Sequence, residues 1–171
     1  TNNQSQNGVT RPQDGDNNGT QTCDIGSYEM PDAAPTVVSI TRVDASPTNL
    51  ASVQFTVTFS ETVTGGVASN FSFTTTGGIS GALVTTVTGS GTTRTVTVDT
   101  GTGDGTIRLD MANSTGVVDG GANPVTNIPF TTGEVYTLDK TAPDTSITGN
   151  PTNPTNSISA TFTFTGSDSG S

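Results

Sequence analysis

Two segments of fifteen residues in this chain have similar sequences, and this internal repeat constrains the fold more than any other feature. Residues 46–60 read SPTNLASVQFTVTFS, and residues 153–167 read NPTNSISATFTFTGS, aligned without a gap at an offset of 107 positions. Self-similarity at a fixed spacing predicts tandem structural modules. We therefore expect one complete module over residues 32–140, preceded by a different segment over 1–31 and followed by the truncated start of a second module over 141–171.

The first of these segments contains the most regular strand pattern in the chain. Val53, Phe55, Val57 and Phe59 alternate with polar residues, and this period of two is typical of a half-buried β-strand. Fully burying apolar side chains of this size stabilises a fold by roughly 1.5–3 kcal/mol each. This strand is therefore the expected centre of a sandwich core.

Six further strand patterns surround it, separated by glycine-rich turns. The expected strands cover residues 37–43, 53–60, 70–75, 83–87, 94–99, 106–111 and 134–138. Val96, Val98, Ile107, Leu109 and Met111 are expected to face the core, whereas Arg108 and Asp110 face outward. About seven short strands, regular turn signals and no helical period predict an all-β fold, an immunoglobulin-like sandwich of antiparallel strands.

Three strings in the central segment carry a family resemblance. They are FTVTFSE, which ends at Glu61, GDGTIRLD over residues 103–110, and YTLDKTAP over residues 136–143. With these strings, residues 35–139 resemble the bacterial immunoglobulin-like modules that repeat in large secreted and surface proteins. The resemblance implies a structural or adhesive spacer with no chemistry of its own.

The first thirty or so residues carry a second resemblance. They contain GVTRP over 8–12, DGDNNG over 14–19 and CDIGSYE over 23–29. This combination resembles the closing segment of bacterial secreted right-handed parallel β-helix proteins. It implies that residues 1–31 are the C-terminal tail of a truncated β-helix domain. Cys23 is the single cysteine, so no disulfide can form within the chain.

Two places offer oxygen ligands for Ca²⁺. Asp14, Asp16 and Asn18 have the spacing that opens an EF-hand-like loop, although Ile25 stands where the bidentate Glu belongs. The alternative for these three residues is a plain Asp/Asn/Gly turn. The second place is the module junction, where Asp32 and Asp139 precede proline-containing linkers, as some cadherin-like arrays use Ca²⁺ to stiffen linkers. A proline-stiffened hinge is the alternative there.

Charge and composition argue against several function classes. The net charge of −10 would repel a nucleic acid backbone, and no apolar run approaches the length of a membrane span. The chain has no histidine, so triads and imidazole metal sites are excluded. Glu61, Glu134 and Asp110 are expected to be solvated strand-end charges and not a glycosidase pair. We therefore expect no enzymatic activity.

These observations together predict a structural or adhesive spacer in a large bacterial protein that is secreted or exposed on the cell surface. Its partners would be neighbouring modules of the same chain, and extracellular surfaces or polysaccharides reached through other domains. One alternative is a spacer in a secreted polysaccharide-degrading enzyme whose active site lies in the β-helix. Another is assembly by strand addition. Residues 151–171 are expected to be disordered or to pair with an exposed sheet edge.

Overall fold

The computed structural model describes residues 32–168, and its regular elements are almost all β-strands. Residues 32–140 contain seven: β1 (Val37–Arg42), β2 (Ser52–Phe59), β3 (Phe71–Gly77), β4 (Leu83–Thr88), β5 (Thr93–Asp99), β6 (Gly105–Met111) and β7 (Val135–Leu138). A single turn of 3-10 helix, η1 (Ala68–Asn70), precedes β3. The expected all-β fold is therefore confirmed.

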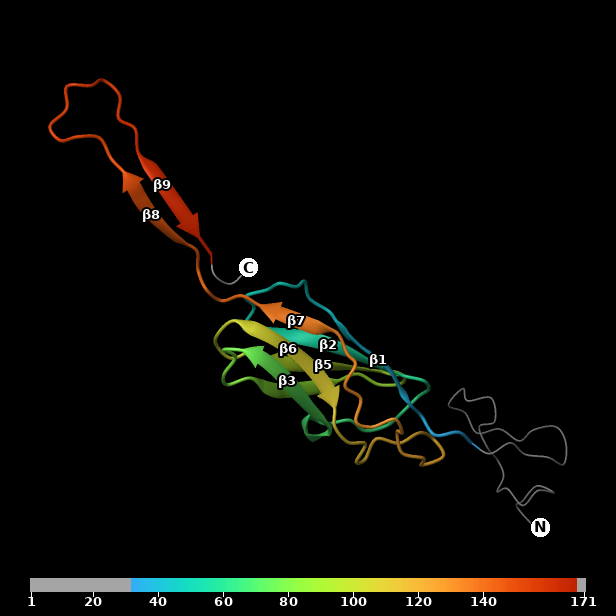
Figure 1. Ribbon diagram of the computed structural model, residues 1–171. Helices are drawn as coiled ribbons and strands as arrows, with labels where there is room; N and C mark the ends of the chain where they lie inside the picture. Colours follow the sequence, from blue (N-terminus) through green and yellow to red (C-terminus); the bar gives the residue numbers. More distant parts are fainter. Residues whose placement is uncertain (1–31, 169–171) are drawn as a thin grey trace, which may run out of the picture.

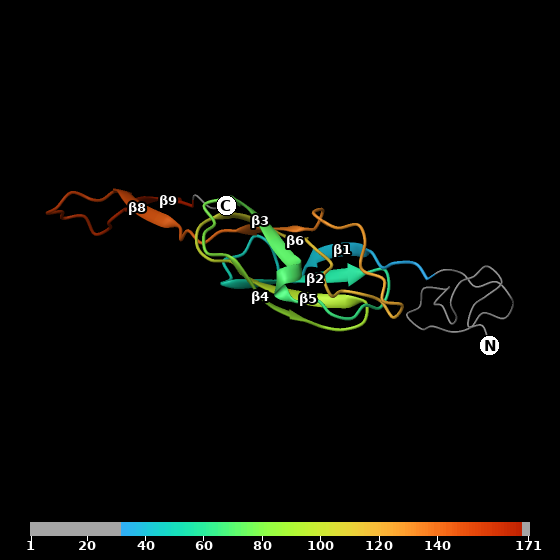
Figure 2. The same ribbon diagram turned by 90° about the horizontal axis from the view of Figure 1, so that it is seen from below.

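The seven strands form two sheets that pack face to face (Figure 2). One sheet has the order β1-β2-β5-β4 and the other β3-β6-β7, and every neighbouring pair is antiparallel. This division and order are those of the constant-type immunoglobulin sandwich, in which strands one, two, five and four face strands three, six and seven.

The strand expected at the centre of the core lies in the middle of the larger sheet. In β2, Val53, Phe55 and Val57 are fully buried and Phe59 is 3% exposed. Phe55 pairs with Val96 of β5, so apolar side chains of neighbouring strands lie side by side on the inner face. The remaining fully buried side chains include Ile40, Val63, Val98, Ile107, Leu109, Met111, Tyr136 and Leu138.

Asp110 differs from the expectation of an exposed outer-face residue. It alternates with the buried residues of β6, as its position predicts, but it is only 5% exposed. The Arg108 guanidinium lies 2.7 Å from one carboxylate oxygen, and the Thr74 hydroxyl donates a 2.8 Å hydrogen bond to the other. These two side chains cover the carboxylate from its own strand and from neighbouring β3.

The chain enters and leaves the sandwich at opposite ends (Figure 1). We call the first end the N-terminal pole (residues 32–36, 60–66 and 112–126), where the start of β1 pairs with the end of β2 through Val37 and Phe59. The other end is the C-terminal pole (residues 46–51, 100–104 and 139–143), where Thr48 bridges to Leu138 at the end of β7. An odd number of antiparallel strands produces this arrangement.

After the C-terminal pole the chain forms a separate hairpin, β8 (Asp144–Gly149) and β9 (Thr163–Ser167). Ile147 pairs with Phe164, and in the complete module Ile40 pairs with Val57. Ile147 is 107 positions after Ile40 and Phe164 is 107 positions after Val57, so the hairpin reproduces the register of β1 with β2. Within the described part of 151–171, β9 is therefore ordered and pairs with β8, which differs from the expectation of disorder or of pairing with the complete module.

Candidate metal centre

Three carboxylates from distant parts of the sequence meet at the N-terminal pole. Asp32 precedes β1, Glu61 follows the end of β2, and Asp119 lies in the long loop between β6 and β7. One carboxylate oxygen from each lies within 4.8 Å of the others. Glu61 is 2% exposed and Asp119 is 4% exposed, so two of the three acids are buried.

The loop residue Asn123 connects two of these acids. Its side-chain nitrogen lies 3.0 Å from Oδ2 of Asp32 and 3.0 Å from Oδ2 of Asp119, and its backbone N–H donates to Oδ1 of Asp119. Gly121 leaves the space that Asp32 needs, because a Cβ there would lie 2.0 Å from Oδ2 of Asp32. The loop is therefore shaped around the Asp32 carboxylate.

The cationic side chains of residues 32–168 make ion pairs or hydrogen bonds with other groups. Arg42 pairs with Glu134, and Arg108 pairs with Asp110. Lys140 lies at the opposite pole and donates to Thr100 and Gly101. Arg94 donates to backbone carbonyls of Val63, Gly65, Gly91 and Thr93, and burial lowers the pKa of its guanidinium.

Three close carboxylates repel one another unless a proton or a cation balances them. The side chains offer only oxygen atoms, which suit hard divalent cations, above all Ca²⁺ with its six to eight oxygen ligands. The Asn123 amide can contribute its oxygen as well, since a half-turn about its last side-chain bond exchanges its oxygen and nitrogen. Asp32, Glu61, Asp119 and Asn123 are therefore the residues that could hold a metal.

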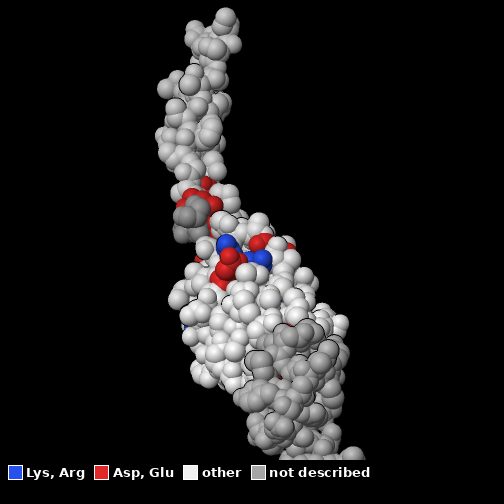
Figure 3. All heavy atoms as spheres, turned by 90° about the vertical axis from the view of Figure 1, so that its right-hand side faces the viewer, with Lys and Arg blue, Asp and Glu red and all other residues white. Residues whose placement is uncertain are grey.

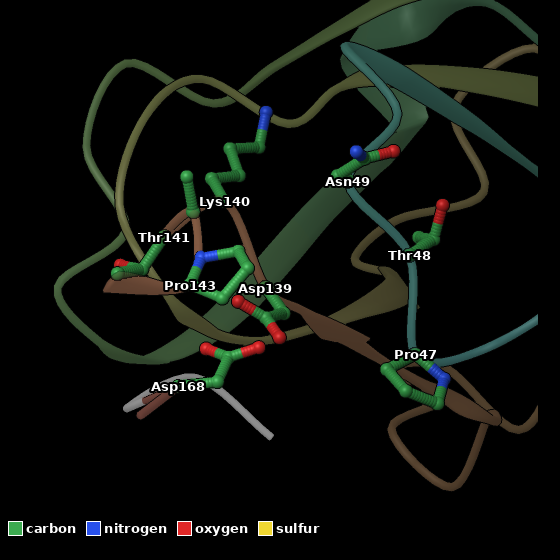
Figure 4. Close-up of a pocket in the computed structure, with 9 residues that line it drawn as sticks. Pro47, Thr48, Asn49, Asp139, Lys140, Thr141, Pro143 and Asp168 are labelled. Carbon is green, nitrogen blue, oxygen red and sulfur yellow. The ribbon is translucent and has the colours of Figure 1, made fainter. Parts of the chain in front are cut away.

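A second candidate site, besides the carboxylate cluster, is the pocket at the C-terminal pole (Figure 4). It lies between the turn at Pro47, the linker Asp139–Pro143 and Asp168 at the end of the hairpin. In Figure 4 the carboxylates of Asp139 and Asp168 turn toward each other, while Lys140 extends away from them. Figure 3 shows acidic side chains gathered at the neck between the sandwich and the hairpin, and a mixed group of acidic and basic side chains on the sandwich next to it.

The linker at this pole is bound to the sandwich. Asp104, in the turn before β6, accepts hydrogen bonds from the Lys140 backbone N–H and the Thr141 hydroxyl. These bonds, the Thr141 side chain first, lower the pKa of Asp104 below its usual value. The Lys140 ammonium adds bonds of 2.7 Å to the Thr100 hydroxyl and 2.9 Å to the Gly101 carbonyl.

The structure places the sequence-predicted residues as follows. Asp14, Asp16 and Asn18 lie outside the described residues. Asp32 and Asp139, expected at the junctions, lie at opposite poles, each beside a second acid.

The expectation that Glu61 is a solvated charge is wrong, because the loop between β6 and β7 and the segment before β1 cover it. Glu134 and Asp110 take part in separate ion pairs with Arg42 and Arg108. Asp119 is a site residue that the sequence did not predict, because nothing local links its loop, Asp119-Gly-Gly-Ala-Asn123, to Glu61.

Comparison with protein-family models found no match. No curated protein matches the chain either. Among solved structures, the chain is similar to the crystal structure of the N-terminal part of the bacterial S-layer protein SbsC, with a TM-score of 0.43 and 25% sequence identity. The similarity covers 67% of this chain and 26% of that one, so the chain spans about a quarter of its length. Within residues 32–168, no helix is long and apolar enough to span a membrane.

Proposed function

We propose that this chain is a spacer segment of a large bacterial protein that is secreted or displayed on the cell surface, built from tandem immunoglobulin-like modules and without chemistry of its own. The observation that carries the proposal is the path of the chain. It enters the sandwich at one pole, leaves at the other, and then begins the same strand pairing again (Figure 1).

A module with its ends at opposite poles adds its full length to a tandem array. Seven-residue strands such as β3, β5 and β6 are about 23 Å long at 3.3 Å per residue. Each added module therefore extends the array by more than that length once the turns at both poles are included. A module with its two ends on one side would fold the array back on itself.

The β8–β9 hairpin is evidence that a second module of the same kind begins here. Ile147, Phe162 and Phe164 are 68%, 56% and 72% exposed, whereas their repeat counterparts Ile40, Phe55 and Val57 are 2% exposed or fully buried. The hairpin thus has the apolar face of a sandwich sheet. We assign residues 141–171 to the start of that module, and residues 1–31 to the end of a β-helix domain on the strength of their sequence alone.

The bound linker supports a stiff spacer rather than a loose tether. Lys140 and Thr141 donate hydrogen bonds to the sandwich, at Asp104, Thr100 and Gly101. The first residues after β7 are therefore expected to move together with the sandwich. Adhesion to a surface or a polysaccharide would then be a property of other domains, which this segment holds at a distance.

Distance measurement between spin labels on the two poles tests the proposal. Ala33→Cys and Ala142→Cys place labels at exposed positions on either pole, in a Cys23→Ser background. We expect one narrow distance distribution centred beyond about 25 Å, the length of the strands between them. A broad distribution, or one centred at a shorter distance, would contradict a stiff end-to-end module.

Strand addition is a second candidate, and the exposed apolar face of the β8–β9 hairpin favours it. Under this candidate the chain forms concentration-dependent oligomers in analytical ultracentrifugation. Phe162→Ser with Phe164→Ser should then restore the monomer, whereas Val38→Ser, a change at an exposed apolar site on the sandwich, should not. A wild-type chain that is monomeric at all concentrations would eliminate it.

A further inference from the structure

Two acids recur at equivalent positions of the repeat. The offset of 107 that aligns the two fifteen-residue segments also places Asp139 on Asp32 and Asp168 on Glu61. The same offset aligns Ser146-Ile147-Thr148 with Ser39-Ile40-Thr41, between the two acids. Each linker aspartate therefore stands at the same chain distance from an acid that follows the second strand of its module.

The structure brings together both members of the second pair, as it does for the first. Asp139 and Asp168 line one pocket, and their carboxylates turn toward each other (Figure 4). The Oδ1 atom of Asp139, a half-buried residue, is itself shielded from solvent and has no hydrogen-bond partner within residues 32–168. Burying a carboxylate oxygen without a donor is costly, and a cation bound between Asp139 and Asp168 would remove that cost.

We propose that each module boundary binds a calcium ion between the linker aspartate and the acid that follows the second strand. At the first boundary these ligands are Asp32 and Glu61, and Asp119 adds a third carboxylate within the same 4.8 Å cluster. At the second boundary they are Asp139 and Asp168. The position equivalent to Asp119 is not part of this sequence, so in the chain as given the first boundary offers three carboxylates and the second offers two.

Calcium fits these positions better than other common cations. The ligands are carboxylate and amide oxygens, and the chain has no histidine to favour zinc, copper or nickel. Calcium also accepts irregular sets of six to eight oxygens, which a site shared between a linker and a loop can supply together with water. The ion would join the linker to the body of the module and so hold successive modules at a fixed angle.

Isothermal titration of the whole chain with CaCl₂ tests the site. We expect saturable binding, and a melting temperature raised by about 5 °C or more at saturating calcium. Glu61→Gln and Asp119→Asn should each weaken the tighter binding step at least tenfold. Glu134→Gln, a matched change at an exposed glutamate paired with Arg42, should leave it unchanged.

Two further variants keep the result interpretable. Asp16→Asn removes the competing candidate in the first thirty residues, and it should leave the tighter step intact. Asp139→Asn lies at the opposite pole and should abolish only the weaker step. If the Glu61→Gln chain fails to fold, the loss of the weaker step in Asp139→Asn still tests calcium binding at a module boundary.

The proposal is overturned if the wild-type chain takes up no calcium at millimolar concentration. It is equally overturned if Asp16→Asn, and not Glu61→Gln or Asp119→Asn, removes the tighter step. The spin-label distance between the poles reports on the spacer role separately, because both labels lie on one module and calcium is not required for that module's length.

Discussion

The rings of Phe55 and Tyr136 meet edge to face across the two sheets, with centroids 5.0 Å apart and planes at 78°. Phe55 comes from β2 at the centre of the larger sheet, and Tyr136 comes from β7 in the smaller one. The Tyr136 hydroxyl extends further, accepting hydrogen bonds from the N–H groups of Val43 and Asp44 and donating to the Gln54 carbonyl. One side chain thus ties together both sheets and the turn after β1.

Removing only the Tyr136 hydroxyl tests how much its hydrogen bonds stabilise the sandwich. Tyr136→Phe keeps the ring contact but leaves the Asp44 N–H without its 2.7 Å acceptor, which we expect to lower the free energy of unfolding by about 1–3 kcal/mol. Urea denaturation followed by circular dichroism measures the loss. Tyr136→Leu should cost more, because it also empties the space of the ring. Wild-type stability in Tyr136→Phe would show that the hydroxyl bonds contribute nothing net.

The internal repeat offers a matched pair of core substitutions. Phe55→Ala should destabilise the sandwich by about 3–5 kcal/mol, since the ring is fully buried. Phe162→Ala changes the counterpart residue, which is 56% exposed, and it should alter the main unfolding transition by less than about 0.5 kcal/mol. Thermal unfolding of both variants side by side makes the comparison. Equal losses would mean that the hairpin belongs to the same cooperative unit as the sandwich.

The linker should loosen in acid. Hydrogen bonds from Thr141 and Lys140 lower the pKa of Asp104 below 3.8, so its contribution to the linker contacts is present above that pH. It is lost as the pH falls through the lowered pKa, because the protonated carboxyl accepts these bonds poorly. NMR chemical shifts of the Lys140 and Thr141 amides should report the change.

Two variants check the assignment to Asp104. Asp104→Asn should show the loosened shifts already at neutral pH, whereas Asp99→Asn, at the end of β5 next to that pole, should keep the wild-type shifts. Amide shifts of Lys140 and Thr141 that follow a different acid, or that do not move between pH 7 and pH 2, would contradict the role of Asp104.

Much of the fold was predictable because its determinants are local. The alternation in β2 and β5 and the glycine turns predict strands within a residue or two of those observed, and the seven-strand count implies the sandwich. The burial of Asp110 was not predictable from its own strand, because it depends on Thr74 of the neighbouring strand and on how Arg108 folds over it.

The carboxylate cluster was missed for a related reason. Asp32, Glu61 and Asp119 are far apart in sequence and meet only because β1 and β2 pair and the loop after β6 crosses the same pole. A signal was nevertheless present in the repeat. Glu61 has an acidic counterpart in Asp168, and Asp32 has one in Asp139, at the same offset of 107 positions.

Stretching the chain between its two ends tests the central claim most directly, because a spacer must carry force from one pole to the other. The account predicts a single cooperative rupture for residues 32–140 that releases roughly 35 nm, the extended length of that segment at up to 3.6 Å per residue less its folded length. Release in several shorter steps, or a gradual extension without a force peak, would contradict one mechanical module loaded from pole to pole.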